Sequence, residues 1–248
     1  MLTEKRYELI LELLDKKRSV TVPEIKDVLG VSESTIRRDL NALDKAGRLT
    51  KVFGGAVSSD GTFTGTEPSV AQKMELQQEE KRRIAQFAAG LIQPDDFVYL
   101  DAGTTTGHIL DYLPARSATF VTNAVSHAKR LAAAGNRVIL IGGELKGTTE
   151  AVIGSQAILT IQGYHFTKGF FGTNGVSKRH GFTTPDPNEA LVKQEAMRQT
   201  ERCYVLADSQ KFGMVSSVTF GVFEEATILT ETEPPEGFSG SKNIRVAK

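Results

Sequence analysis

Two stretches of the chain carry residue types that could bind phosphate groups. In the first, Asp101-Ala-Gly-Thr-Thr-Thr-Gly107, hydroxyls and backbone amides follow an apolar strand that ends at Leu100. Such groups form a phosphate cradle when they converge at the start of a helix. The turn has neither the Gly-Lys-Ser/Thr ending of a Walker A loop nor a G-x-G-x-x-G dinucleotide fingerprint. Two interpretations of this stretch therefore stay open: a phosphate-binding turn, or an ordinary turn between a strand and a helix.

The second stretch, Ser32-Glu-Ser-Thr-Ile-Arg-Arg-Asp-Leu-Asn41, combines hydroxyls with two arginines. A helix that begins at Ser32 places Ile36, Leu40 and Leu43 on one buried face. Its other face presents groups that contact phosphates and base edges in a DNA major groove. The expected DNA contacts on this helix are Ser32, Ser34, Thr35, Arg37, Arg38 and Asn41.

The elements around this helix predict a winged helix-turn-helix. An earlier helix is capped by Thr3, and a short second helix begins at a capping box of Thr21 and Glu24 and ends at Gly30. The buried face of the first helix is expected to consist of Tyr7, Ile10, Leu11 and Leu14.

A small β-hairpin is expected to follow the third helix and to form the wing. Its strands are residues 48–53 and 56–57, joined through Gly54-Gly55, and Arg48 and Lys51 on it are further expected DNA contacts. The alternative is a three-helix protein-binding module with a solvated charged face.

The rest of the chain predicts an α/β fold, because strands alternate with helices. The expected helices are 71–91, 108–113, 124–134 and 187–200, and the expected strands are 97–100, 118–122, 137–141 and 203–207. This alternation indicates a mainly parallel sheet, whose ligands bind beyond the carboxyl ends of the strands. Five polar or glycine positions follow such ends and predict a pocket there: Asp101, Asn123, Gly142, Gly172 and Asp208.

Composition and charge narrow the class of protein. The 248 residues have zero formal net charge, but residues 1–57 carry 11 Lys and Arg against 9 Asp and Glu, and the remainder carries 19 against 21. The zero net charge of the whole chain thus hides a slightly basic N-terminal module at residues 1–57. The charged N-terminus resembles neither a signal peptide nor a membrane span, so a soluble cytoplasmic protein is expected. Cys203 is expected to be a buried thiol, and no metal is predicted for the four His.

A Ser-, Thr- and Gly-rich segment separates the two parts of the chain. We expect a DNA-binding domain at residues 1–57, a linker at 58–68, an effector-binding and oligomerisation domain at 69–232 and a tail at 233–248. The tail is expected to add an edge strand at 243–247.

The motifs resemble those of the DeoR family of bacterial transcriptional regulators. The resemblance covers about residues 1 to 232, and the order of the motifs is as specific as the motifs themselves. The matching stretches in the front module are 29–40, 47–49 and 54–57, and those in the second are 101–106, 121–123, 141–145, 172–175, 189–193 and 207–213.

The resemblance implies a winged helix-turn-helix followed by an effector domain similar in fold to ribose-5-phosphate isomerase and CoA transferases. It also implies double-stranded operator DNA as partner, a sugar-phosphate effector, no cofactor and a homodimer or homotetramer. The phosphate end would be held by Asp101, Gly103, Thr104, Thr105 and Thr106. Around the sugar would lie Asn123, Gly143, Glu189, Lys193, Asp208 and Lys211.

Residues 140–145 and 171–176 resemble the fructose-operon branch of the family, which implies a sugar-operon repressor that responds to fructose 1-phosphate. Two other functions stay open. A sugar-phosphate isomerase would use Asp101 or Glu189 as base and Lys193 or Lys211 to stabilise an enediolate, but it has no need of the first 57 residues. A signalling adaptor would use the helical module on protein and would show no salt-dependent DNA binding.

Overall fold

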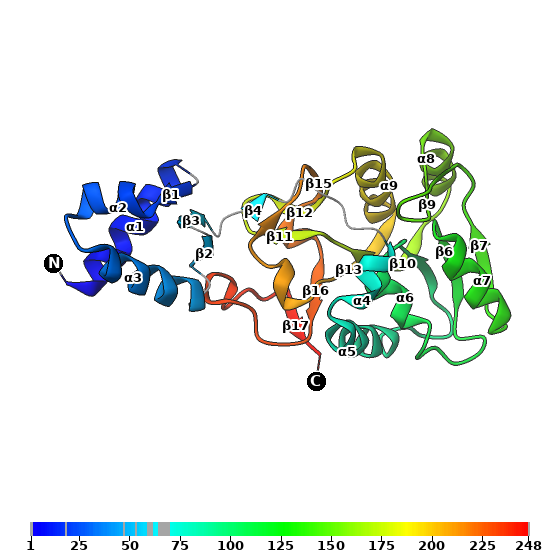
Figure 1. Ribbon diagram of the computed structural model, residues 1–248. Helices are drawn as coiled ribbons and strands as arrows, with labels where there is room; N and C mark the ends of the chain where they lie inside the picture. The colour runs from blue at the N-terminus through cyan, green and yellow to red at the C-terminus, as the bar shows by residue number, and fades with distance from the viewer. Residues whose placement is uncertain are drawn as a thin grey trace. The chain divides into compact units, whose positions relative to one another are not determined.

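A computed structural model of the chain describes residues 2–17, 19–46, 48–52, 54–58, 62–63 and 70–247. The chain divides into two compact units, residues 1–62 with 234–240 and residues 63–233 with 241–248. Figure 1 labels the elements of both units. No helix in the described part of the chain is long and apolar enough to cross a membrane.

The first unit has three helices and a small antiparallel sheet in the order β1-β3-β2. Its elements are α1 (Thr3–Lys17), β1 (Ser19–Thr21), α2 (Val22–Leu29), α3 (Glu33–Lys45), β2 (Leu49–Val52) and β3 (Gly55–Ser58). Ile10, Ile25, Ile36 and Leu40 are fully buried and form the centre of its core. The predicted winged helix-turn-helix is thereby confirmed, with β1 as an additional strand that the sequence analysis did not predict.

Local signals set the helix boundaries in this unit. Thr21 accepts a hydrogen bond from the Glu24 amide at 3.3 Å, and the Glu24 carboxylate accepts one from the Thr21 amide at 2.8 Å, so the predicted capping box is confirmed. Gly30 ends α2 in the left-handed region, at φ 65°. The prediction for Thr3 is wrong: it is the first helical residue of α1, and the Leu2 carbonyl accepts the Arg6 amide at 3.2 Å. Phe53, predicted in the wing, lies outside the described residues.

The second unit is built on a seven-stranded sheet in which neighbouring strands are parallel, in the order β17-β16-β13-β10-β5-β6-β7. The strands are β5 (Phe97–Leu100), β6 (Thr119–Thr122), β7 (Arg137–Leu140), β10 (Phe166–Gly172), β13 (Thr200–Leu206), β16 (Thr227–Thr230) and β17 (Ile244–Val246). The predicted parallel sheet and the predicted edge strand of the tail are both confirmed.

Helices pack on both faces of this sheet (Figure 1). One face carries α5 (Gln78–Ala89), α6 (Thr104–Ile109) and α7 (Val125–Ala133), and its core includes Ile84, Leu100 and Phe170. Alternate strand residues such as Tyr99 and Phe171 point to the other face, where α9 (Pro187–Arg198) packs against α8 (Ser155–Gln162) and strands β10 and β13.

Two predicted helices differ from the structure. The stretch 71–91 is broken into α4 (Val70–Glu75) and α5, because Gln77 adopts a positive φ of 51°. The helix predicted at residues 108–113 instead begins at Thr104, inside the Gly/Thr turn, and ends at Ile109. Both differences move polar residues of the turn and of α5 to one edge of the sheet.

Several elements had no counterpart in the predictions. In the central sheet this is β16. The others are β4 (Thr62–Phe63), the hairpin β8 (Glu144–Lys146) and β9 (Ala151–Ile153), helix α8, the strands β11 (Gly175–Ser177), β12 (Gly181–Thr184), β14 (Met214–Val215) and β15 (Val218–Gly221), and the short 3-10 helices η1 (Ser209–Lys211), η2 (Phe223–Glu225) and η3 (Glu236–Phe238). Strands β11, β12 and β15 form a second, antiparallel sheet, and β4 pairs with β14.

Candidate functional site

A cavity of about 290 Å³ lies at the carboxyl edge of the parallel sheet. The turns after β5, β10 and β13 all reach it, as the positions of the strand ends predicted. It is lined by Val70, Lys73, Leu76, Gln77, Lys81, Ala102, Gly103, Thr104, Thr105, Thr149, Gly172, Thr173, Asn174, Glu189, Lys193, Asp208, Gln210, Lys211 and Met214. Seven of the eleven predicted effector residues are in this lining: Gly103, Thr104, Thr105, Glu189, Lys193, Asp208 and Lys211.

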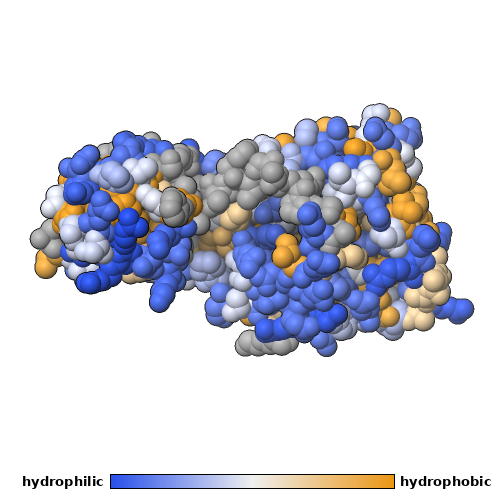
Figure 2. All heavy atoms as spheres, viewed as in Figure 1, coloured by the Kyte–Doolittle hydropathy of each residue, from blue (hydrophilic) through white to orange (hydrophobic). Residues whose placement is uncertain are grey.

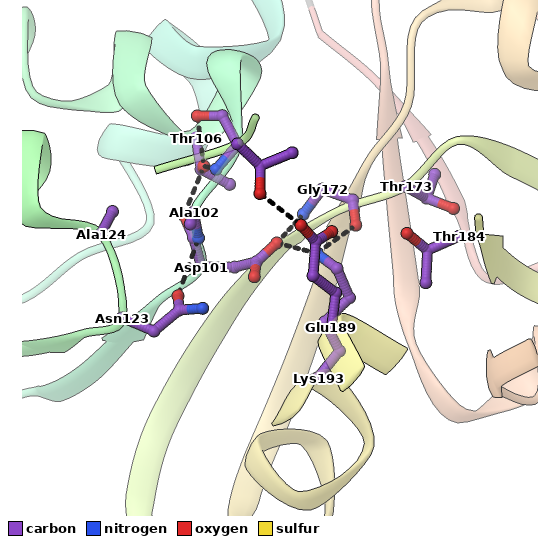
Figure 3. A network of polar contacts seen from close by, with 12 residues as sticks. Asp101, Ala102, Thr106, Asn123, Ala124, Gly172, Thr173, Thr184, Glu189 and Lys193 are labelled. Carbon is purple, nitrogen blue, oxygen red and sulfur yellow. Dashed lines mark hydrogen bonds and ion pairs between the residues drawn. The ribbon is translucent and has the colours of Figure 1, made fainter. Parts of the chain in front are cut away.

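At the centre of this edge, Asp101 forms a buried ion pair with Lys193 (Figure 3). The exposed fractions of the two residues are 1% and 6%. Asp101 Oδ2 also accepts the Gly172 amide at 3.0 Å, and Lys193 Nζ donates to the Gly172 carbonyl at 3.1 Å. The Asp101 carboxylate thus accepts an amide of the neighbouring strand β10 in addition to its pair with Lys193.

Glu189 is held at the first turn of α9 by two donors. Its Oε1 accepts from the Thr149 hydroxyl and, at 3.1 Å, from Lys146 Nζ. Asp186 caps α9 by accepting the Glu189 amide at 2.9 Å, and it also pairs with Lys146 at 3.1 Å. These contacts fix a carboxylate of low exposure in the cavity wall, beside the pair formed by Asp101 and Lys193 (Figure 3).

Two predicted effector residues shape the Gly/Thr turn instead of lining the cavity. Thr106 is buried, its hydroxyl donates to the Asp101 carbonyl at 2.7 Å, and it accepts the Gly103 amide at 3.0 Å. Asn123 Oδ1 accepts the Ala102 amide at 2.9 Å, and its Nδ2 donates to the Val152 carbonyl at 3.2 Å. Both side chains thus hold the turn in place from behind.

Gly143 also lies away from the cavity lining, and its role is in the backbone. Its φ is 154°, and a Cβ added there would come within 2.5 Å of the Ile153 carbonyl. Glycine is therefore needed where the chain enters β8 and passes close to the end of β9. Gly142, one of the five predicted pocket positions, is exposed and is not in the lining either.

Sequence reasoning missed a lysine of α5 at this cavity. Lys81 is 5% exposed, its Nζ donates to the Lys73 carbonyl, and it lines the cavity with Lys211 and Asp208. Burial lowers the pKa of the Lys81 ammonium, and burial raises the pKa of the Asp208 carboxyl. In the sequence, Lys81 sits in the charged run Glu79-Glu-Lys-Arg-Arg83, which reads as a solvated helix surface.

The first unit presents the predicted DNA-contacting side chains on its surface. Ser32 caps α3 by accepting the Thr35 amide at 3.3 Å, and its hydroxyl lies 2.9 Å from those of Ser34 and Thr35. The exposed set consists of Ser32, Ser34, Arg37, Arg38, Asn41, Arg48 and Lys51, whereas Thr35 is half-buried. The face of α3 and the wing therefore carry hydroxyl, amide and cationic groups that a DNA groove could meet.

Two family models match the chain, one for each unit. Residues 6–62 match the DeoR-like helix-turn-helix domain, and residues 76–232 match the DeoR C terminal sensor domain. The chain belongs to the DeoR family of transcriptional regulators. It is a DNA-binding transcriptional regulator, with its helix-turn-helix in the first unit and its sensor domain in the second.

Relatives match this DeoR-family chain over nearly its whole length. It is 42% identical to the uncharacterized HTH-type transcriptional regulator FruR of Bacillus subtilis (strain 168), covering 100% of this chain and 98% of that protein. It is 34% identical to the lactose phosphotransferase system repressor of Streptococcus mutans, covering 92% of each. Among solved structures, ribose 5-phosphate isomerase A of Methanocaldococcus jannaschii aligns at 12% identity with a TM-score of 0.41, covering 54% of each chain.

The aspartate of the family signature in α3 has a structural task. Asp39 is 2% exposed and receives both Nε and Nη2 of Arg6 in α1, at 2.6 and 2.9 Å. This bidentate pair connects α1 to α3, the helix that carries the predicted DNA-contacting residues. A sequence pattern could indicate neither partner, because they are separated by 32 intervening positions and lie on different helices.

Replacement of Asp39 by asparagine is expected to lower the melting temperature of the winged unit by about 5 °C or more. The variant keeps the side-chain shape but turns an amide group toward the Arg6 guanidinium, which loses its counter-charge. Glu33→Gln is the control, because it breaks an exposed pair with Arg37 on the same helix, at 3.4 Å. Equal melting temperatures for the two variants would contradict a structural role for Asp39.

A buried histidine predicts how stability changes with pH. His127 is 6% exposed and its Nδ1 has no hydrogen-bond partner in the described part of the chain. Burial lowers the pKa of His127 to about 4, against the opposing effect of Asp101. Between about pH 6.5 and pH 4, His127 is therefore protonated in the unfolded chain but neutral in the folded chain. The free energy of unfolding keeps its full value above pH 6.5 and decreases as the pH is lowered through this window.

We expect about 2 kcal/mol of unfolding free energy to be lost between pH 7 and pH 5 because of His127. Urea denaturation at both pH values measures this loss in the parent protein and in His127→Asn. The variant should show a smaller loss by that amount. An identical pH dependence in both proteins would show that His127 is not the group responsible.

The described residues contain no group of three or more His, Cys, Asp or Glu arranged to hold a metal ion. Cys203 is half-buried, and burial raises the pKa of its thiol to about 12, with a further contribution from Glu225. At neutral pH this thiol is protonated, which suits a packing role and not nucleophilic chemistry.

Proposed function

We propose that this DeoR-family regulator represses a sugar-utilisation operon and leaves its operator when a phosphorylated sugar binds the sensor domain. The observation that carries the proposal is the cavity at the carboxyl edge of the sheet, with Lys81, Lys193 and Lys211 in its lining. Lysines supply charge for a phosphate, and the carboxylate of Glu189 can accept hydrogen bonds from sugar hydroxyls.

The relatives support a sugar as the signal. One is named a lactose phosphotransferase system repressor, and another is named FruR. Fructose 1-phosphate is our first candidate, and the site needs no cofactor for binding. The protein would act on double-stranded operator DNA in the cytoplasm.

Release from DNA follows if the effector binds one conformation of the sensor domain better than another. The shift in operator affinity can be no larger than this difference in effector affinity. Two half-sites in an operator are bound by two helix-turn-helix units. We therefore propose a homodimer or homotetramer that is assembled through the second unit.

Exposed apolar side chains support self-association at the open edge of the sheet. Leu140 ends the edge strand β7, Leu145 lies in β8 and Leu159 in α8, and their exposed fractions are 42%, 55% and 62%. Figure 2 shows apolar residues gathered at the end of the larger unit where Figure 1 places β7 and α8. Such clusters mark protein contacts more often than solvent surface.

A gel shift on the DNA upstream of the protein's own gene tests the proposal. Sugar phosphates, the corresponding free sugars and inorganic phosphate are added one at a time. Release by one sugar phosphate and not by its free sugar is the expected result. Retention of the operator with every phosphorylated sugar, or equal release by sugar and sugar phosphate, would contradict it.

We further propose that the cavity binds its ligand without turnover. Both candidate bases are engaged: Asp101 by Lys193 and the Gly172 amide, and Glu189 by Lys146 and Thr149. Interconversion of aldose and ketose phosphates above background by the purified protein would favour the isomerase alternative instead. The signalling-adaptor alternative predicts no operator binding and no dependence on salt, which the same gel shift examines.

A further inference from the structure

The charged side chains in the cavity lining, together with their ion-pair partners behind it, form two groups of different character. One group is Asp101 with Lys193 and Glu189 with Lys146, in which every carboxylate has a lysine partner. The other is Lys81 and Lys211 with Asp208, in which Lys81 has no carboxylate partner within 4 Å among the described residues. Against the effect of burial, Asp208 and Glu80 raise the pKa of Lys81, whereas Lys211 and Lys73 lower it, and the buried Glu231 raises the pKa of Asp208.

Resting on the proposed function, we infer that the phosphate of the effector binds at Lys81 and Lys211, and that the group around Asp101 and Glu189 receives the sugar hydroxyls. Lys81 is thereby assigned a ligand-binding role that the sequence motifs did not indicate. The assignment also moves the phosphate from the Asp101 end of the Gly/Thr turn toward α5 and η1.

The charge of the Lys81 ammonium is poorly compensated in the free protein. The ammonium is buried, it donates to the neutral carbonyl of Lys73, and no ion pair within 4 Å compensates it among the described residues. A buried ammonium without a close counter-charge is costly in the free protein. A phosphate monoester carries nearly two negative charges at neutral pH and would supply the missing charge.

At the Asp101 end of the cavity, the positive charge is already compensated. Lys193 is matched by Asp101, and its remaining contacts are the Gly172 carbonyl and the ring of Phe220, 5.4 Å from Nζ. A dianion placed there would be opposed by the carboxylates of Asp101 and Glu189. Sugar hydroxyls would instead find acceptors, because both contacts of Glu189 use Oε1 and leave Oε2 available.

Elements α4, α5 and η1 meet at the proposed phosphate site, near Lys81 and Lys211. Gln77, at the break between α4 and α5, lies beside Gln210 of η1, and both line the cavity with Lys81 and Lys211. Amide side chains at this point can donate to phosphate oxygens. Gln77 is the left-handed residue that precedes α5, the helix that carries the buried Lys81.

The test crosses two variants with two probes in titration calorimetry on the full chain. Lys81→Met should weaken binding of fructose 1-phosphate, or of whichever sugar phosphate releases the operator, by about 10- to 100-fold, and should weaken inorganic phosphate similarly. Glu189→Gln should weaken the sugar phosphate but leave inorganic phosphate unchanged. Lys129→Met, an exposed lysine on α7, is the matched control and should bind both probes as the parent does.

Melting temperatures separate a binding role of Lys81 from a structural one. Because Lys81→Met removes a buried charge, the free variant should melt no lower than the parent, while losing the stabilisation that the ligand gives the parent. A variant that binds the sugar phosphate as tightly as the parent would overturn the inference, and so would one that melts lower without ligand. If the parent protein itself binds no phosphorylated sugar, the proposed function fails, and the inference about Lys81 fails with it.

Discussion

Replacement of Asp101 by asparagine is expected to lower the free energy of unfolding of the sensor unit by about 3 to 5 kcal/mol. The carboxylate is buried, and it neutralises Lys193 while accepting the Gly172 amide. Asparagine would keep the shape but leave the Lys193 ammonium buried without its counter-charge. Because single domains have unfolding free energies of about 5 to 15 kcal/mol, this loss is a large fraction of the total.

A double-mutant cycle isolates the ion pair from other effects of the substitution. Lys193→Met should cost a similar amount, since it strands the Asp101 carboxylate, whereas Asp101→Asn with Lys193→Met should cost much less than the sum. Urea denaturation followed by circular dichroism measures all four proteins. Additive losses would show that the two side chains do not act as a pair, and a loss below about 1 kcal/mol for either single variant would show that the pair is solvated.

The strand ends of the sensor unit could be predicted from sequence, and with them the edge where the cavity lies. Asp101, Gly172 and Asp208 each follow an apolar run, and parallel strands bring their carboxyl ends to one edge. Periodicity could not show which side chains meet there. Asp101 and Lys193 lie 92 positions apart, and their contact depends on how α9 crosses the sheet.

Other features left no signal in the sequence at all. Gln77 adopts a conformation that favours glycine or asparagine, so nothing indicated that the helix predicted at 71–91 would break there. Without that break, Lys81 reads as one more exposed charge in an acidic and basic run. Strands β11 and β12 are short and buried on both sides, so their residues lack the polar and apolar alternation that marks a half-buried strand.

In the winged unit, local rules predicted almost everything. Thr21 and Glu24 form their capping box, Gly30 ends α2, and Ser32 caps α3, because each depends on contacts within four residues. The Thr3 cap is the local prediction that is wrong. The features that were not predicted, the pairing of β1 with β3 and the pair of Arg6 with Asp39, join residues that are far apart in the sequence. For these contacts the limit is sequence separation, not residue type.

Replacement of Arg37 by alanine is expected to abolish operator retention in a gel shift without changing the thermal transition. Arg37 is exposed on α3, and its contact within the protein is a surface pair with Glu33 at 3.4 Å, which contributes little to folding. Each arginine that reads a guanine is worth about 1 to 3 kcal/mol, and a symmetric dimer loses two such contacts. Affinity would then fall by roughly one to four orders of magnitude.

Arg202→Ala is the matched control, because Arg202 is also exposed and pairs with its neighbour Glu201 at 3.6 Å, but it lies in the sensor unit. It should retain the operator as the parent does, and equal retention by Arg37→Ala would contradict a DNA contact.

The salt dependence of operator binding by Arg37→Ala then distinguishes two kinds of contact. If Arg37 binds a phosphate, its loss weakens all sequences alike and lowers the slope of log affinity against log salt by about one per contact. If it reads a base, the slope stays nearly constant and discrimination against substituted operators falls. The second outcome is expected, because residues 1–57 have a net charge of only +2 and would bind DNA weakly without base contacts from α3.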